Sequence, residues 1–99
     1  MINEPENCKS IEDIRSEIDR IDYDLIQLIA QRSKYVKNAA KYKTTKNTVK
    51  AEDRVAAMID QRRIWAKELD LSMDFVELQF RAMIQYFINQ EMKEWECKN

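Results

Sequence analysis

Residues 11–43 read IEDIRSEIDRIDYDLIQLIAQRSKYVKNAAKYK, and this stretch decides the fold. Taken in alternating steps of three and four, nine of ten positions are apolar or aromatic, which is the repeat of a long amphipathic helix. The exception is Arg32, a permanent cation that needs a buried acid or an anionic ligand as its partner. The ten positions, called the apolar seam below, are Ile11, Ile14, Ile18, Ile21, Leu25, Leu28, Arg32, Tyr35, Ala39 and Tyr42.

The length of this predicted helix indicates a dimer. A helix of this stretch spans about 50 Å at about 1.5 Å per residue, whereas a compact domain of this size has a radius of gyration of about 13 Å. A lone helix of that length would leave its apolar seam in water. A second copy of the chain would cover it.

The composition favours helix throughout. The 99 residues include no glycine and one proline, and no Asn-Gly or Asp-Gly hairpin signal occurs. We therefore predict a single all-α domain over residues 1–99. Ser10 with Asp13, and Asp74 with Glu77, have the spacing of N-terminal capping boxes. The predicted elements are helices at about 11–43, 52–69 and 74–95, with a loop at 44–51.

Charge and composition restrict the function. With 17 basic and 18 acidic residues the net charge is -1, which argues against a nucleic-acid binder. No run of 18 apolar residues predicts a membrane span, and residues 1–10 lack the apolar core of a secretory signal. We predict a cytoplasmic protein in which Cys8 and Cys97 are reduced thiols. The absence of histidine removes Ser-His and Cys-His catalysis and His-ligated metal sites, so no cofactor or metal is predicted.

Five charged residues are candidate site residues. Arginine binds a carboxylate through two parallel hydrogen bonds, so this set predicts a pocket for a ligand with two carboxylates. No nucleophile lies beside a base, and the site would act by positioning and electrostatics. Each residue also has a structural explanation, such as a solvated helix flank, a helix-end cation or an internal ion pair. The candidates are Arg15, Arg32, Lys43, Arg54 and Glu91.

The spacing of three cations on the first helix is more specific. Lys43 follows Arg32 by 11 residues, about three turns, so both lie on nearly one face. Arg15 precedes Arg32 by 17 residues, and it points roughly 100° away at about 25 Å along the axis. One chain cannot easily bring Arg15 to that face, whereas an antiparallel second copy can.

These residues resemble the all-α chorismate mutase family, and within it the isochorismate-pyruvate lyases of salicylate and siderophore biosynthesis. The resemblance covers roughly residues 8–95. It implies an intertwined homodimer of three-helix chains in which each active site takes one arginine from the other chain. The similar segments are DIRSEIDRIDYDLIQLIAQRSKYVKNAAKYK (13–43), EDRVAAMI (52–59) and FINQEMKEW (87–95).

The resemblance also implies roles for the candidate residues. Arg32 and an Arg15 from the partner chain would bind the two carboxylates of the substrate. Lys43 would bind a carboxylate and the ether oxygen whose bond breaks. Arg54 would lie at the start of the second helix, near loop 44–51, which is either a plain connector or a mobile cover carrying two lysines, Lys46 and Lys50.

Two positions depart from the family pattern. Mutases of this type often carry a glutamate just after the second-helix arginine, where it accepts from the hydroxyl of chorismate, but this chain has Val55, which cannot accept. The family usually has glutamine at the position of Glu91, where it donates to the ether oxygen. Because an ionised carboxylate cannot donate, Glu91 would need a proton, which predicts best activity at mildly acidic pH.

The resemblance implies elimination of pyruvate from isochorismate to give salicylate, by a pericyclic step without cofactor, and a weak chorismate mutase side activity. Two alternatives remain open. One is chorismate mutase as the main activity, with Glu52 or Asp53 making the hydroxyl contact that Val55 lacks. The other is a non-catalytic helical module that dimerises or binds a partner through the apolar seam.

Overall fold

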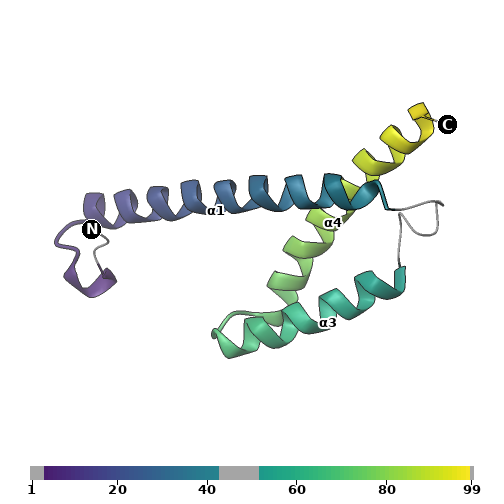
Figure 1. Ribbon diagram of the computed structural model, residues 1–99. Coiled ribbons are helices and arrows are strands. Elements are labelled where there is room, and N and C mark those ends of the chain that lie inside the picture. Colours follow the sequence, from purple (N-terminus) through teal and green to yellow (C-terminus); the bar gives the residue numbers. More distant parts are fainter. Residues whose placement is uncertain (1–3, 43–51, 99) are drawn as a thin grey trace. The chain divides into compact units, whose positions relative to one another are not determined.

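The computed structural model describes residues 4–42 and 52–98, and all regular structure in these ranges is helical (Figure 1). The all-α prediction is confirmed. The chain forms two compact units, residues 1–35 and 36–99, and each is described by itself. A short 3-10 helix, η1 (Pro5–Asn7), precedes three α-helices: α1 (Ile11–Ala40), α3 (Glu52–Glu68) and α4 (Met73–Lys98).

The start of α1 is fixed by a serine cap. The backbone N–H of Asp13 donates to Ser10 Oγ at 3.1 Å, as the sequence predicts. The Asp13 carboxylate accepts from the backbone N–H of Lys9 at 3.0 Å instead of returning a bond to Ser10. The helix ends at Ala40 rather than near residue 43, and Tyr42 N–H donates to Ala39 in a closing turn. Lys43 and loop 44–51 lie outside the described residues.

The apolar seam of α1 lies in water. No residue of α1 is buried, and the exposed fraction is 49% at Ile18, 59% at Leu28 and 79% at Tyr35. A contiguous apolar surface of this length marks an interaction site rather than ordinary solvated surface. No helix of the described residues is both long and apolar enough to cross a membrane.

Helices α3 and α4 pack against each other as an antiparallel hairpin (Figure 1). Their buried apolar side chains are Ile59 and Ala66 from α3 and Ile84 and Phe87 from α4. The predicted second and third helices are confirmed, with ends that differ by a few residues. This hairpin borders a cavity that both of its helices line.

The turn between α3 and α4 is a Schellman motif. Leu71 N–H donates to Ala66 O at 2.8 Å, and Asp70 N–H donates to Lys67 O at 3.2 Å. Asp70 has φ 59°, the left-handed conformation that this motif requires at its closing residue. Since the chain has no glycine, an aspartate takes a position that glycine usually fills.

The predicted cap of the third helix was wrong. Ser72 Oγ accepts from the backbone N–H of Phe75 at 3.1 Å, so Ser72 is the capping residue and α4 begins at Met73. Asp74 and Glu77 instead accept from Arg63 Nη1 of α3 at 2.9 and 2.8 Å. The two carboxylates that the sequence pattern predicted to cap the helix therefore pair with an arginine of α3 instead.

Candidate active site

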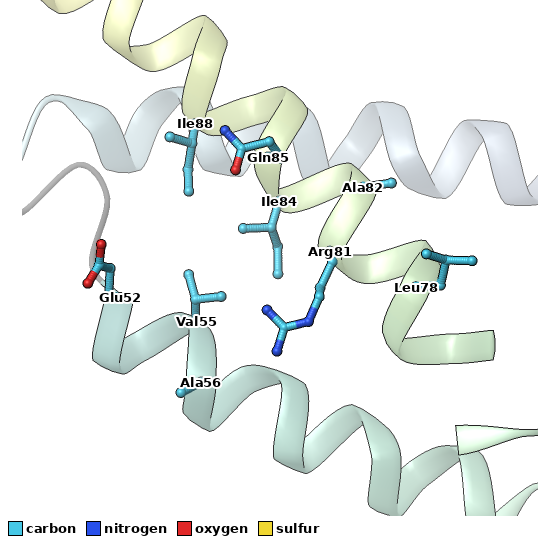
Figure 2. A pocket seen from close by; sticks show the side chains of 9 residues that line it. All are labelled: Glu52, Val55, Ala56, Leu78, Arg81, Ala82, Ile84, Gln85 and Ile88. Atoms are coloured by element: carbon cyan, nitrogen blue, oxygen red, sulfur yellow. The ribbon is translucent and has the colours of Figure 1, made fainter. Parts of the chain in front are cut away.

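Helices α3 and α4 border an open cavity of about 730 Å³ (Figure 2). A volume of this size holds a small organic ligand. The lining residues follow helical spacing, so each helix contributes one face. They are Glu52, Val55 and Ala56 from α3, and Leu78, Arg81, Ala82, Ile84, Gln85 and Ile88 from α4.

The wall of the cavity is mostly aliphatic. Val55 of α3 and Ile84 and Ile88 of α4 point into the space between the helices (Figure 2). Ile84 is 8% exposed and belongs also to the hairpin core. Such a wall excludes water from one side of a ligand and strengthens the polar contacts made on the other side.

Two charged side chains polarise the cavity. Glu52 lies at the start of α3, and the guanidinium of Arg81 extends from α4 toward α3 (Figure 2). Gln85 lines the cavity one helical turn after Arg81 on α4, and its amide N–H donates to Asn89 Oδ1 at 2.9 Å. The cavity thus combines one carboxylate and one guanidinium with a mostly aliphatic wall.

The candidate site residues on α3 and α4 are only partly brought together. Val55 lines the cavity, whereas Arg54 is exposed in the first turn of α3 and is not among the lining residues. Glu91 is 6% exposed on α4, one turn beyond Ile88, and it also lies outside the lining set. Among the residues that the structure describes, Glu91 is the one charged residue that is buried. Its surroundings therefore differ from those of the other described carboxylates, which are more accessible to water.

The other predicted residues belong to α1. Arg15 is exposed and Arg32 is half-buried. Burial lowers the pKa of the Arg32 guanidinium from its ordinary value, although an arginine still carries its charge at neutral pH. Both arginines lie in the unit 1–35, so the five candidate residues are not assembled within one unit. Lys43 lies outside the described residues.

Arg81 was missed by the sequence analysis. It follows Glu77 by four residues and precedes Ile84 and Ile88 by three and seven, so it lies on the face of α4 that lines the cavity. Its helical spacing from Ile84 and Ile88 is the signal that could have identified it. Gln85, on the same face, was missed for the same reason.

The two cysteines lie near the ends of the chain, and the metal prediction concerns all of the described residues. Cys8 is a free, half-buried thiol, and desolvation followed by the nearby Asp13 carboxylate raises its pKa. The side chain of Cys97 lies outside the description. Within 4–42 and 52–98, no group of three or more His, Cys, Asp or Glu side chains could hold a metal ion.

Residues 14–92 match the model of the family chorismate mutase type II, and the chain belongs to that family. The resemblance drawn from the residues of α1 is therefore confirmed.

Two relatives show how the similarity is distributed. The isochorismate pyruvate lyase of Pseudomonas aeruginosa is 42% identical over 91 residues, which are 92% of this chain and 90% of that protein. The T-protein of Haemophilus influenzae is 37% identical over 70 residues, which are 70% of this chain but 19% of that protein. The match therefore covers about nine-tenths of both this chain and the lyase, but only 19% of the T-protein.

Proposed function

We propose that this protein is an isochorismate pyruvate-lyase that converts isochorismate to salicylate and pyruvate. The observation that carries the proposal is the similarity over nine-tenths of both chains to a protein named isochorismate pyruvate lyase. The cytoplasmic location and a role in salicylate-derived siderophore synthesis are part of the same proposal.

The proposed enzyme is a homodimer with shared active sites. The exposed seam of α1 supports this, because burial of its isoleucines and leucines is worth about 25 cal/mol per Å² of apolar surface removed from water. In each site Arg32 and the partner's Arg15 bind the two carboxylates of the substrate. Lys43 contacts the ether oxygen, and Arg54 lies at the entrance.

In the proposed reaction every bond that forms or breaks lies within the substrate. The C–O bond between the ring and the enolpyruvyl group breaks while a ring hydrogen moves to the methylene carbon of that group. The enolpyruvyl group leaves as pyruvate, and the ring becomes aromatic salicylate. The protein holds the compact conformer and stabilises negative charge on the ether oxygen through Lys43, and through Glu91 if its carboxyl group is protonated.

Val55 supports the lyase over the mutase. It lines the cavity with Ile84 and Ile88, and none of these three side chains can accept a hydrogen bond from a substrate hydroxyl. A mutase of this family often has a glutamate at the position of Val55, as described above. The cavity wall therefore lacks one contact that chorismate would use.

Chorismate mutase is the second candidate. One specific observation favours it: Glu52 lines the same cavity, one helical turn before Val55. Its carboxylate can accept a hydrogen bond from a hydroxyl, as the glutamate of the mutases does. The carboxylate of Glu52 is thus an acceptor three residues before the position of Val55, where the mutases often carry their glutamate.

Parallel assays on two substrates test the proposal. Purified protein is mixed with isochorismate, with salicylate followed by its fluorescence, and with chorismate, with its loss followed by absorbance. Fast salicylate formation with slow chorismate loss is expected. Fast chorismate loss with little salicylate would make the protein a mutase and direct attention to Glu52. No turnover of either substrate from about pH 5 to 8 would contradict both enzyme functions. It would favour the alternative of a non-catalytic helical module that binds a partner through the apolar seam.

A further inference from the structure

Arg81 presents an unused edge of its guanidinium to the cavity. Its Nε donates to Glu77 Oε2 at 2.6 Å, and its Nη nitrogens make no hydrogen bond or ion pair with residues 4–42 or 52–98. Figure 2 shows the side chain extending from α4 into the space between α3 and α4, on the side of Val55 and Ile84. The Nη groups are therefore hydrogen-bond donors that a ligand in the cavity can reach.

Glu77 holds this guanidinium in place. One of its oxygens accepts from Arg81, and the other accepts from Arg63 Nη1 of α3 at 2.8 Å, so the carboxylate is fixed from two helices. The hydrogen bond from Arg81, together with that from Arg63, lowers the pKa of Glu77, and the carboxylate stays ionised at neutral pH. A side chain that is oriented before a ligand arrives loses less conformational entropy when the ligand binds.

The charge of Arg81 is only partly offset by its neighbours. Glu77 is shared between two arginines, and the nearby Asp74 pairs with Arg63 rather than with Arg81. The Asp74 side chain is 91% exposed, so water and salt screen its charge. Glu52 is the other charged residue of the lining, and Figure 2 shows it on the far side of Val55 from Arg81. The outer edge of the guanidinium thus remains attractive to an anion.

The guanidinium lies within the aliphatic lining of the cavity. On α4, Leu78 lines the cavity one turn before Arg81, and Ile84 and Ile88 line it about one and two turns after Arg81. Val55 adds an aliphatic side chain from α3. Apolar surface on both sides of a charge keeps water away from it and strengthens an ion pair formed there.

We propose that the α3–α4 cavity binds a small aromatic carboxylate, with the carboxylate paired to the Nη groups of Arg81 and the ring packed against Val55, Ile84 and Ile88. Two parallel hydrogen bonds from one edge of a guanidinium match the two oxygens of a carboxylate. The lining of α4 from Arg81 to Ile88 extends over about 10.5 Å. This length accommodates one ring with its carboxylate, whereas an extended acyl chain would project beyond it.

The inference goes beyond the proposed reaction. That reaction assigns the carboxylates of the substrate to Arg32 and Arg15 and gives Arg81 no part, whereas this site binds an aromatic acid whether or not the chain turns over isochorismate. One consequence rests on the proposed function. A ligand held at Arg81 covers the wall on which Val55 lies, so it should inhibit salicylate formation by competing with the substrate.

Three small molecules test the two parts of the proposed site. Benzoate carries the ring and the carboxylate, benzamide is its uncharged counterpart, and acetate lacks the ring. Titrations of the full chain are followed by the methyl NMR signals of Val55, Ile84 and Ile88. Benzoate is expected to bind at least about fivefold more tightly than either of the others, because only benzoate makes both the ion pair and the apolar contact.

The matching variant is Arg81→Gln. It should weaken benzoate by about fivefold or more and leave benzamide unchanged, since benzamide makes no ion pair with the guanidinium. Lys93→Gln is the control, because Lys93 is an exposed cation of α4 outside the cavity, and its affinity for benzoate should equal that of the wild type. If Arg81→Gln fails to fold by circular dichroism, Arg81→Lys replaces it, with a loss of about threefold expected because lysine cannot form the two parallel bonds.

Three results would overturn the proposal. The first is a wild type that does not bind benzoate. The second is an Arg81 variant that binds benzoate as tightly as the wild type, or a Lys93→Gln protein that loses as much affinity as Arg81→Gln. The third is a set of benzoate-induced shifts that leaves out the methyl groups of Val55, Ile84 and Ile88, which would place the ligand elsewhere.

These outcomes separate the inference from the proposed function. Salicylate formation by a wild type whose benzoate affinity does not depend on Arg81 would keep the reaction and remove the site. A loss of benzoate affinity in Arg81→Gln, in a protein that turns over neither isochorismate nor chorismate, would keep the site and remove the reaction.

Discussion

Val55 occupies the wall of the cavity where a hydrogen-bond acceptor would change the substrate preference. We predict that Val55→Glu raises the ratio of chorismate turnover to salicylate formation by about tenfold or more, since one hydrogen bond to a charged group contributes about 1.5–3 kcal/mol. The ratio is measured with both substrates at equal concentration. Val55→Ala, which also lacks an acceptor, is the control and should leave the ratio near that of the wild type.

In the proposed mechanism Glu91 donates a hydrogen bond to the ether oxygen, and we predict that the activity depends on pH for this reason. Its carboxyl group donates to the ether oxygen only when protonated, so kcat/KM of the wild type should fall as pH rises, by up to about tenfold per unit. Glu91→Gln donates at every pH and should be flat from about pH 5 to 8, with the higher rate at neutral pH. Arg32 stays charged throughout this range and does not contribute to the slope. Flat profiles in both proteins would remove Glu91 from the reaction.

The residues that the sequence did not reveal share one property. Arg81 is held by Glu77, and Glu77 also binds Arg63, which lies across the turn on another helix. A helical pattern reports which face a residue lies on, and it contains no information about partners from a different helix. Arg32 was recognisable because a cation interrupts an otherwise apolar seam, and Arg81 was not, because it lies at the exposed edge of its stripe.

The turn between α3 and α4 shows what a helix end requires. Asp70 adopts a left-handed conformation that costs a residue with a Cβ about 1 kcal/mol relative to glycine. We predict that Asp70→Gly stabilises the protein by about 0.5–1 kcal/mol, with a rise of a few degrees in Tm measured by circular dichroism. Glu68→Gly, in the last turn of α3 itself, should instead lower Tm, since glycine is unfavourable inside a helix.

The three helices could be predicted because their 3.6-residue periodicity is strong and nothing in the chain favours strands. Their ends were less certain. Ser10 was identified as a cap because no tertiary partner competes for it, and its bond to Asp13 is present. Asp74 and Glu77 have the same spacing, but Arg63 attracts both, and the serine two residues before Asp74 caps the helix. Ion pairs with a residue of another helix therefore override a capping preference that contributes about 1 kcal/mol.

The assembly of two chains is tested by complementation. In the proposed dimer each site uses Arg32 of one chain and Arg15 of the other, so Arg15→Ala and Arg32→Ala should each lose at least about a hundredfold in kcat/KM. Mixed in equal amounts and allowed to exchange, they should recover about a quarter of wild-type activity. Half of the dimers are then heterodimers, and one of the two sites in each is intact. No recovery after exchange would place both arginines in the same chain.

The exposed seam of α1 has a further consequence for the protein in a cell. A helix in which no residue is buried is marginal in water, so in the proposed dimer the folding of α1 and the association of the two chains would become one event. Newly made chains at low abundance would spend longer in a state open to proteases, and degradation would remove them before they meet. The amount of enzyme would then respond more steeply than linearly to its rate of synthesis, so that weak expression yields almost none and modest induction yields a lasting supply.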